Sequence, residues 1–140
     1  MLENLKLKYM LVNFDLDLKD KMILIRGFSG TGKSFLYKAL EAYSLYNDDR
    51  FVFLDWRTAR NIDISMYLKK LSGKVIVIDN ADIILSDEDR LYISMDTNNQ
   101  YIIMCHNITG FKPGRMSFAL ISEENRTIKL EYLFNKRKLV

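Results

Sequence analysis

Eight residues in the first quarter of the chain read Gly27-Phe28-Ser29-Gly30-Thr31-Gly32-Lys33-Ser34, which fits the pattern G-x-x-x-x-G-K-[ST]. In this pattern a glycine-rich loop follows a buried strand and opens a helix. The apolar run at residues 22–25 predicts that strand, and residues 35–40, which contain neither Gly nor Pro, predict the helix. The alternative is a glycine-rich turn before a purely structural helix. The matching context on both sides favours a loop that binds phosphate.

Each part of this motif has a chemical reason if the ligand carries phosphates. Glycines let the backbone approach a polyphosphate closely and turn its N–H groups toward it, and the positive end of the helix dipole lies at the same place. Lys33 would neutralise the charge of the β- and γ-phosphates, and the Ser34 hydroxyl would ligate Mg²⁺. We therefore expect a run of phosphate-binding residues, namely Ser29, Gly30, Thr31, Gly32, Lys33, Ser34 and Phe35.

Length and composition predict a single domain over residues 1–140. A chain of 140 residues with a hydrophobic fraction of 49% can bury one core. The net charge of +3, from 21 basic and 18 acidic residues, does not indicate nucleic-acid binding. The single cysteine rules out an internal disulfide and favours a cytoplasmic location. No apolar run approaches about 18 residues, so we expect no membrane span.

Strands and helices alternate from residue 22 to residue 105. Beyond the first strand, apolar runs predict buried strands at residues 51–54, 74–79 and 101–105. The intervening patterns predict helices at about residues 33–46, at 64–71 with Gly73 as C-cap, and at 86–96 with Ser86 as N-cap. This alternation gives right-handed βαβ units and therefore a mostly parallel sheet.

Both flanks of the alternating region predict antiparallel strands instead. Apolar and polar residues alternate over residues 4–10 and again over 12–18, which predicts two antiparallel strands before the glycine-rich motif. Residues 116–121 and 127–133 alternate in the same way and predict a β-hairpin that turns around Glu123-Glu124-Asn125. The sheet is therefore expected to be mixed, with a parallel centre.

The carboxyl ends of parallel strands are where such sheets bind ligands. This rule gathers the glycine-rich motif, residues 55–57, residues 79–82 and residues 106–107 at one edge. Asp79 follows four consecutive β-branched residues and would hold Mg²⁺ beside Ser34. The alternative for Asp79 is an acid that caps a turn at the end of a strand.

With both motifs in a βαβ frame, residues 22–107 resemble the P-loop NTPase superfamily, in which they would be Walker A and Walker B. The resemblance implies an α/β fold of three αβα layers that binds ATP with Mg²⁺. GTP is the lesser expectation, because residues 107–110 do not fit a guanine-binding NKxD motif. The order of motifs resembles AAA-type and ABC-type ATPases, in which another strand lies between the two strands that carry the Walker motifs.

Two details resemble the ABC-type branch in particular. These are the antiparallel lead-in before Met22 and the strand that ends at His106. The resemblance implies that His106 contacts the γ-phosphate and that Tyr9 stacks on adenine. A plain strand-end histidine is the equal alternative for His106, and a core position is the favoured alternative for Tyr9.

The chain also departs from both branches. It has no LSGGQ-like signature between the Walker motifs, and Asn80 stands where AAA-type ATPases have a glutamate. Asn80 cannot act as a base, and hydrolysis needs a group that orients and deprotonates water. Asp82 is the candidate for this role, and its alternative is an N-cap for residues 83–85. An arginine finger has no motif behind it, and the candidates are Arg57, Arg90 and Arg115.

These features leave three functions open, and the candidate catalytic residues for an enzyme are Lys33, Asp79, Asp82 and His106. The first is a weak Mg²⁺-dependent ATPase, activated by a protein partner or by self-association. The second is a non-hydrolysing switch in which ATP orders the region around Trp56 and His106. The third and least favoured is a small-molecule kinase, because the hairpin at residues 116–133 offers no arginine-bearing lid.

Overall fold

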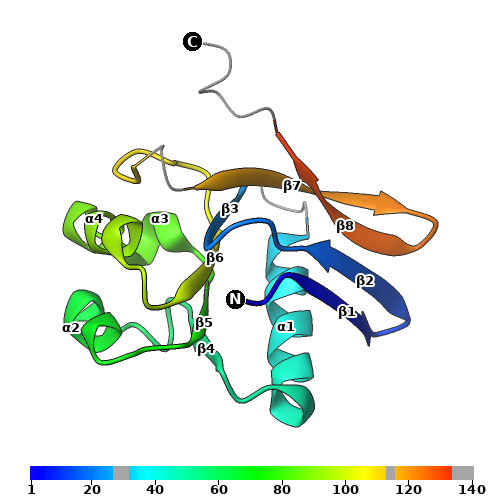
Figure 1. The fold of residues 1–140 in the computed structure, drawn as a ribbon, viewed down its shortest axis with the longest axis horizontal. Helices are drawn as coiled ribbons and strands as arrows, with labels where there is room; N and C mark the ends of the chain where they lie inside the picture. Colours follow the sequence, from blue (N-terminus) through cyan, green and yellow to red (C-terminus); the bar gives the residue numbers. More distant parts are fainter. Residues whose placement is uncertain (27–31, 113–115, 134–140) are drawn as a thin grey trace.

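The computed structural model describes residues 1–26, 32–112 and 116–133 (Figure 1). Its strands are β1 (Asn4–Tyr9), β2 (Val12–Asp17), β3 (Met22–Arg26), β4 (Phe51–Leu54), β5 (Val75–Ile78), β6 (Gln100–Met104), β7 (Ser117–Glu124) and β8 (Thr127–Tyr132). Its helices are α1 (Lys33–Asn47), α2 (Ile64–Lys69), α3 (Ala81–Ile84) and α4 (Asp87–Met95). The predictions for Ser29, Gly30, Thr31 and Arg115 lie outside the described residues.

All eight strands belong to one mixed sheet in the order β1-β2-β8-β7-β3-β6-β5-β4. The pairs β3–β6, β6–β5 and β5–β4 are parallel, whereas β1–β2 and β7–β8 are antiparallel hairpins. An α/β fold with a mixed sheet is therefore confirmed. The parallel pairs among β3, β6, β5 and β4 occupy one side of this sheet, and both hairpins lie on the other side. Strand β6 lies between β3 and β5, where the motif order implied another strand.

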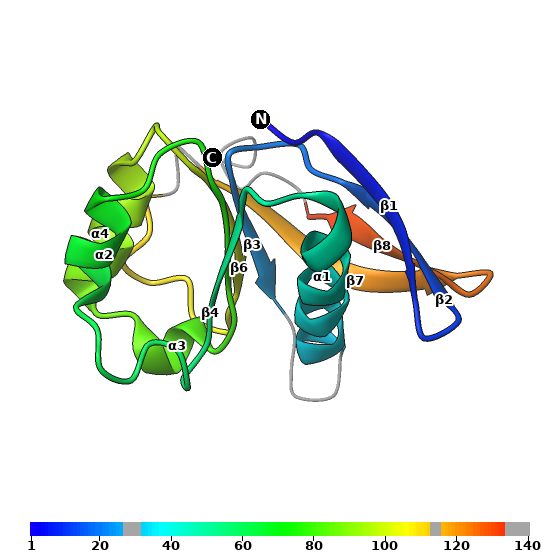
Figure 2. The same cartoon turned by 90° about the horizontal axis from the view of Figure 1, so that it is seen from below.

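Helices cover both faces of the sheet. In Figure 2, α1 lies on one face, and α2, α3 and α4 lie on the other. The central strands are apolar on both sides because each contributes to two cores. Ile23 and Ile25 of β3 pack with Leu36 and Leu40 of α1. Leu24 packs in the core on the opposite face. Burial of one such side chain stabilises a protein by about 1.5–3 kcal/mol.

The C-terminal hairpin joins the two parts of the sheet. Strand β7 pairs in parallel with β3, and β8 pairs in parallel with β2. Within the sheet, the N-terminal hairpin is therefore separated from the central strands by β7 and β8, which lie between β2 and β3 (Figure 1). The sequence predicted both hairpins but not this insertion.

Both hairpins turn through two residues with positive φ. In the β7–β8 turn these are Asn125 and Arg126, with φ of 54° and 60°. In the β1–β2 turn they are Met10 and Leu11, with φ of 48° and 66°. Two-residue turns of this hand suit Asn-Gly, whereas an apolar Met-Leu pair is strained there. Met10 and Leu11 are also 71% and 83% exposed, so burial does not offset the strain.

The helix ends follow the sequence with one correction. Ser86 is the N-cap of α4 and forms a reciprocal capping box with Asp89, as its position predicted. The prediction that Gly73 caps α2 is wrong, since the C-cap is Lys70. Gly73 lies beyond the helix at a φ of 70°, where its N–H donates to the carbonyl oxygen of Asn98. No described helix has the length and apolarity to cross a membrane.

Candidate functional site at the carboxyl edge of the sheet

Gly32 determines where α1 begins. Its φ of 96° lies in the left-handed region, and its carbonyl oxygen accepts the first helical hydrogen bond from Leu36 N at 2.9 Å. A Cβ at this position would lie 3.9 Å from the Ile121 side chain, so backbone conformation rather than space requires glycine. The first-turn amides of α1 start directly behind Gly32 and carry the positive end of the helix dipole.

Ser34 and Asp79 meet across the sheet edge. Ser34 lies in the first turn of α1, and Asp79 directly follows β5. The Ser34 hydroxyl donates to Asp79 Oδ2 at 3.2 Å, and Asp79 Oδ1 accepts from Asn80 N at 2.9 Å. Asp79 is 8% exposed. The two residues predicted to ligate a metal therefore lie side by side.

The oxygen atoms of Ser34 and Asp79 suit Mg²⁺, which prefers oxygen ligands and binds through one or two protein groups plus phosphates and water. Among the residues that the structure describes, no cluster of three or more His, Cys, Asp or Glu could hold a metal by itself. A hydroxyl and one carboxylate are consistent with a Mg²⁺ ion that arrives with a polyphosphate. They do not fit a resident structural metal.

Lys33 lies against His106. The Lys33 Nζ is 3.2 Å from His106 Nε2, although the two residues are 73 positions apart. Burial lowers the pKa of Lys33, and the charges of Asp82 and Asp79 act in the opposite direction. When the ammonium donates this hydrogen bond, Nε2 accepts it and the imidazole is neutral. The basic group at the start of α1 and the histidine at the end of β6 thus form one site with Ser34 and Asp79.

Asp82 has partners other than those predicted. The prediction that it caps residues 83–85 is wrong, because Asp82 lies inside α3, and the N-cap of that helix is Asn80. Its Oδ2 accepts from His106 N at 2.7 Å, and its Oδ1 accepts from Asn107 N at 2.9 Å. Burial pushes the pKa of Asp82 up, but these two bonds and the Arg90 charge hold it below its ordinary value. A carboxylate so engaged is a weak base.

Arg90 is the residue that the sequence did not assign correctly. It is 5% exposed, so it cannot reach into a neighbouring molecule as an arginine finger. Its Nη1 donates to the carbonyl oxygens of Asn107 and Thr109 at 2.7 and 2.8 Å. Its Nη2 lies 3.5 Å from Asp82 Oδ1, and its guanidinium lies over the Phe111 ring. No local pattern marks these contacts, which join segments 8–21 residues apart.

Three aromatic residues of this region belong to the core or its border. The Tyr9 ring is 5.4 Å from the Phe35 ring and packs against the core on the α1 face, which favours the core alternative for Tyr9. Tyr37 of α1 is 5% exposed. Within the described residues its hydroxyl has no hydrogen-bond partner. Burial raises the pKa of Tyr37, and the nearby charges of Asp55, Glu41 and Asp79 add to this.

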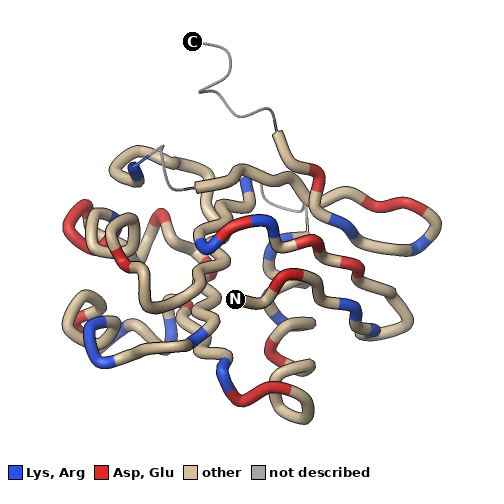
Figure 3. The backbone as a smooth tube through the Cα atoms, in the orientation of Figure 1, with Lys and Arg blue, Asp and Glu red and all other residues tan. Residues whose placement is uncertain are grey.

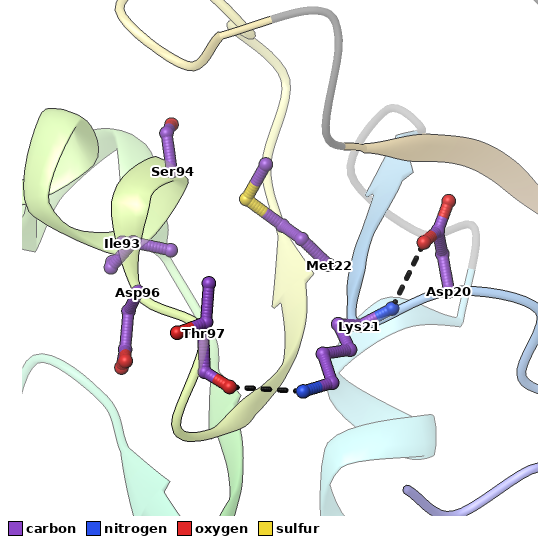
Figure 4. A pocket seen from close by; sticks show the side chains of 7 residues that line it. All are labelled: Asp20, Lys21, Met22, Ile93, Ser94, Asp96 and Thr97. Atoms are coloured by element: carbon purple, nitrogen blue, oxygen red, sulfur yellow. Dashed lines mark hydrogen bonds between the residues drawn. The ribbon is translucent and has the colours of Figure 1, made fainter.

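A pocket lies at the opposite edge of the sheet, where β3 begins. Figure 4 shows this pocket of about 430 Å³, which is lined by Asp20, Lys21, Met22, Ile93, Ser94, Asp96 and Thr97. Lys21 Nζ donates to the carbonyl oxygen of Thr97 at 2.9 Å, and Lys21 N donates to Asp20 Oδ1 at 3.1 Å. Its charged groups are thus already bound within the protein, and none of the predicted site residues lines it.

In the view of Figure 3, Lys and Arg are interspersed with Asp and Glu along the described backbone. Two arginines gather in the loop after β4, where Trp56 is 45% exposed. Arg57 and Arg60 lie over this indole ring at 5.4 and 5.0 Å from its centroid.

Comparisons with known proteins give little further guidance. No family model matches this chain, and no curated protein matches it. Among solved structures, a chain of ribosome-bound archaeal Pelota and ABCE1 is similar to it over 97% of its residues, with 11% identity and a TM-score of 0.48. The present chain spans 34% of that chain's length. A similarity this low carries no conclusion about family or function.

Proposed function

We propose that this protein is a P-loop protein that binds a nucleoside triphosphate, preferentially ATP, together with Mg²⁺. The observation that carries the proposal is the 3.2 Å contact between Ser34 Oγ and Asp79 Oδ2, directly behind the left-handed Gly32. It brings the ends of the two sequence motifs together at the start of a 15-residue helix. A helix start, an ammonium group and two oxygen ligands are what a triphosphate with Mg²⁺ requires.

In this proposal, different residues would bind the phosphates and the metal. The first-turn amides of α1 and Lys33 would neutralise the phosphates, and Ser34 and Asp79 would hold the metal. A Mg²⁺ ion held there would neutralise part of the phosphate charge. The 3.2 Å distance between Lys33 Nζ and His106 Nε2 supports the proposal that both would contact a terminal phosphate.

Two versions of this function differ in whether the bound triphosphate is hydrolysed. A weak or partner-activated ATPase needs a group that orients water, and a protein partner or a second copy would supply it. A non-hydrolysing switch needs only binding and a response. The engagement of both Asp82 oxygens by backbone amides favours the switch, because the nearest carboxylate after Asp79 is a poor base. A kinase remains the weakest proposal, since β7 and β8 are central in the sheet order and do not form a lid.

Calorimetry with ATP, GTP and a non-hydrolysable ATP analogue, each with and without Mg²⁺, tests the binding. We expect Lys33→Ala to weaken ATP binding at least ~10-fold, about 1.4 kcal/mol. The control is Lys38→Ala, an exposed lysine of the same helix, which should leave the affinity unchanged. Absence of binding by the wild type at millimolar ATP, or an unaffected Lys33→Ala variant, contradicts the proposal.

Phosphate release measured on the same samples separates the two versions. Release that disappears in Lys33→Ala supports the ATPase. Tight binding of ATP without release, also in the presence of candidate partners, supports the switch. Transfer of phosphate to an acceptor other than water would point to the kinase instead.

A further inference from the structure

We propose that Asp82 and Arg90 are positioning residues that hold His106 at the terminal-phosphate position, so that this pair sets the preference for triphosphate over diphosphate. The inference rests on the proposed function and adds the regulation of the same site. We refer to Asp82 and Arg90 together as the clamp. It acts on residues 106–109, which follow β6 and contain no regular secondary structure.

The clamp binds both amide groups and carbonyl groups of this segment. Asp82 of α3 accepts from two consecutive amides, His106 N at 2.7 Å and Asn107 N at 2.9 Å. Arg90 of α4 donates to the carbonyl oxygens of Asn107 and Thr109 at 2.7 and 2.8 Å. Helices α3 and α4 both lie on the face of the sheet opposite α1 (Figure 2). Charged hydrogen bonds of this kind are about twice as strong as neutral ones.

The clamp itself is well anchored. Arg90 is 5% exposed and its guanidinium lies over the Phe111 ring at 4.9 Å. The capping box of Ser86 and Asp89 fixes the first turn of α4, and Asp89 directly precedes Arg90. Cys105 N donates to the carbonyl oxygen of Ile25, which ties the residue before His106 to β3. The position of the His106 backbone is therefore determined from three elements.

The charges explain why the clamp needs both residues. A lone carboxylate beside the phosphate site would repel a triphosphate, and Arg90 compensates the charge of Asp82. Ordering a loop residue costs backbone entropy, and the clamp removes this cost from the binding step. The gain applies to ligands that reach His106. On the proposed function, both nucleotides would reach Lys33, but only a triphosphate would extend to His106, and a diphosphate would end one phosphate short of it.

The test compares ATP and ADP affinities of Asp82→Asn with those of the wild type. The asparagine side chain has one accepting oxygen and cannot bond both amides. We expect ATP affinity to fall ~10-fold and ADP affinity to fall less than ~2-fold, the loss of one or two charge-assisted bonds. The matched control is Asp48→Asn, a carboxylate after α1 that also accepts from a backbone amide and a guanidinium, both of Arg50, and lies outside the clamp and its anchors. It should leave the ratio of the two affinities unchanged.

The single histidine of the chain provides a second readout. In the wild type we expect the His106 ring resonance to shift with ATP and not with ADP, and in Asp82→Asn we expect this difference to be lost. If Asp82→Asn does not fold, Arg90→Lys serves with the same readouts, because its ammonium cannot bond both carbonyls and Asp82 together. An unchanged ATP-to-ADP ratio with an unchanged ring resonance overturns the clamp alone. Wild-type protein that binds neither nucleotide overturns the proposed function and the clamp with it.

Discussion

Gly32 carries the strictest backbone requirement at the candidate site. With φ at 96°, any residue with a side chain is strained there by about 1–2 kcal/mol. The nearest atom to an added Cβ is 3.9 Å away, so crowding adds nothing. The same backbone conformation places the amides of Lys33 and Ser34 at the exposed start of α1. Stability and ligand binding thus depend on one dihedral angle.

We therefore expect Gly32→Ala to lower the free energy of unfolding by about 1–2 kcal/mol and to weaken ATP binding as well. Urea unfolding and calorimetry measure the two effects. The control is Gly73→Ala, whose φ of 70° is also left-handed and whose added Cβ would meet nothing within 4 Å. It should lose similar stability and keep ATP affinity. Equal binding by both variants would contradict the role given to Gly32.

At this scale the sequence predicted some partners and not others. The pairing of Ser34 with Asp79 follows from two motifs whose strand and helix context is legible in the chain. The contacts of Asp82 with the amides after β6 depend on a four-residue helix, α3, and on how the chain folds over 24 positions. Apolar spacing carries no information about such polar contacts. For the same reason, the sequence offered Arg90 only as a candidate arginine finger and gave no sign of its contacts with Asn107 and Thr109.

At the scale of the elements, buried strands were the easiest to predict. Strands β3, β5 and β6 are apolar on both faces because helices cover both, and unbroken apolar runs report this. The ends of helices that lack a distinctive capping residue were harder to predict. Gly73 suggested the end of α2, but the turn after Lys69 places that glycine three residues past the C-cap.

The β1–β2 turn gives a prediction at the same scale. We expect the double variant Met10→Asn with Leu11→Gly to raise the free energy of unfolding by about 1 kcal/mol, because Asn-Gly adopts this turn without strain. Thermal or urea unfolding measures the change. Leu45→Ala removes a leucine that is 74% exposed in a helix and should shift stability by less than about 0.5 kcal/mol. A less stable double variant would show that the exposed Met-Leu pair contributes contacts that outweigh its strain.

At the scale of the whole molecule, the Cys105 thiol and the Tyr101 hydroxyl are buried in their neutral, protonated forms. Burial raises the pKa of the Cys105 thiol to about 11. Burial also raises the pKa of Tyr101, helped by the hydrogen bond from its hydroxyl to Asp96 Oδ2. In the unfolded chain these groups ionise near their ordinary values of about 8.5 and 10. The unfolded state therefore loses protons first as the pH rises, and folding is favoured below that range.

We accordingly expect the free energy of unfolding to fall steadily above about pH 8.5, with Cys105 contributing about 2 kcal/mol of the loss by about pH 10.5. Urea unfolding at about pH 7, 9 and 10.5 measures the slope. Cys105→Ala has no thiol to ionise, so its stability should fall less steeply over the same range. Parallel curves for the two proteins would show that Cys105 ionises as easily in the folded chain as in the unfolded one.

The overall strand order was the least predictable feature. The resemblance implied that another strand lies between β3 and β5, but it named neither β6 for that place nor the position of β4. The parallel pairing of β2 with β8 joins residues more than 100 positions apart, for example Asn13 with Thr127. Alternation shows that a strand has one buried face, but it does not name the neighbour. Only the assembled sheet decides that.

That pairing has a consequence for how the protein is made. Because β7 and β8 separate β2 from β3, a ribosome must release nearly all of the described chain before the N-terminal hairpin can find its permanent neighbour. Until then, the side of β3 that later receives β7 is an open edge able to pair with another nascent chain. Because the sheet closes late, the risk of pairing with another chain is greatest before β8 has been synthesised.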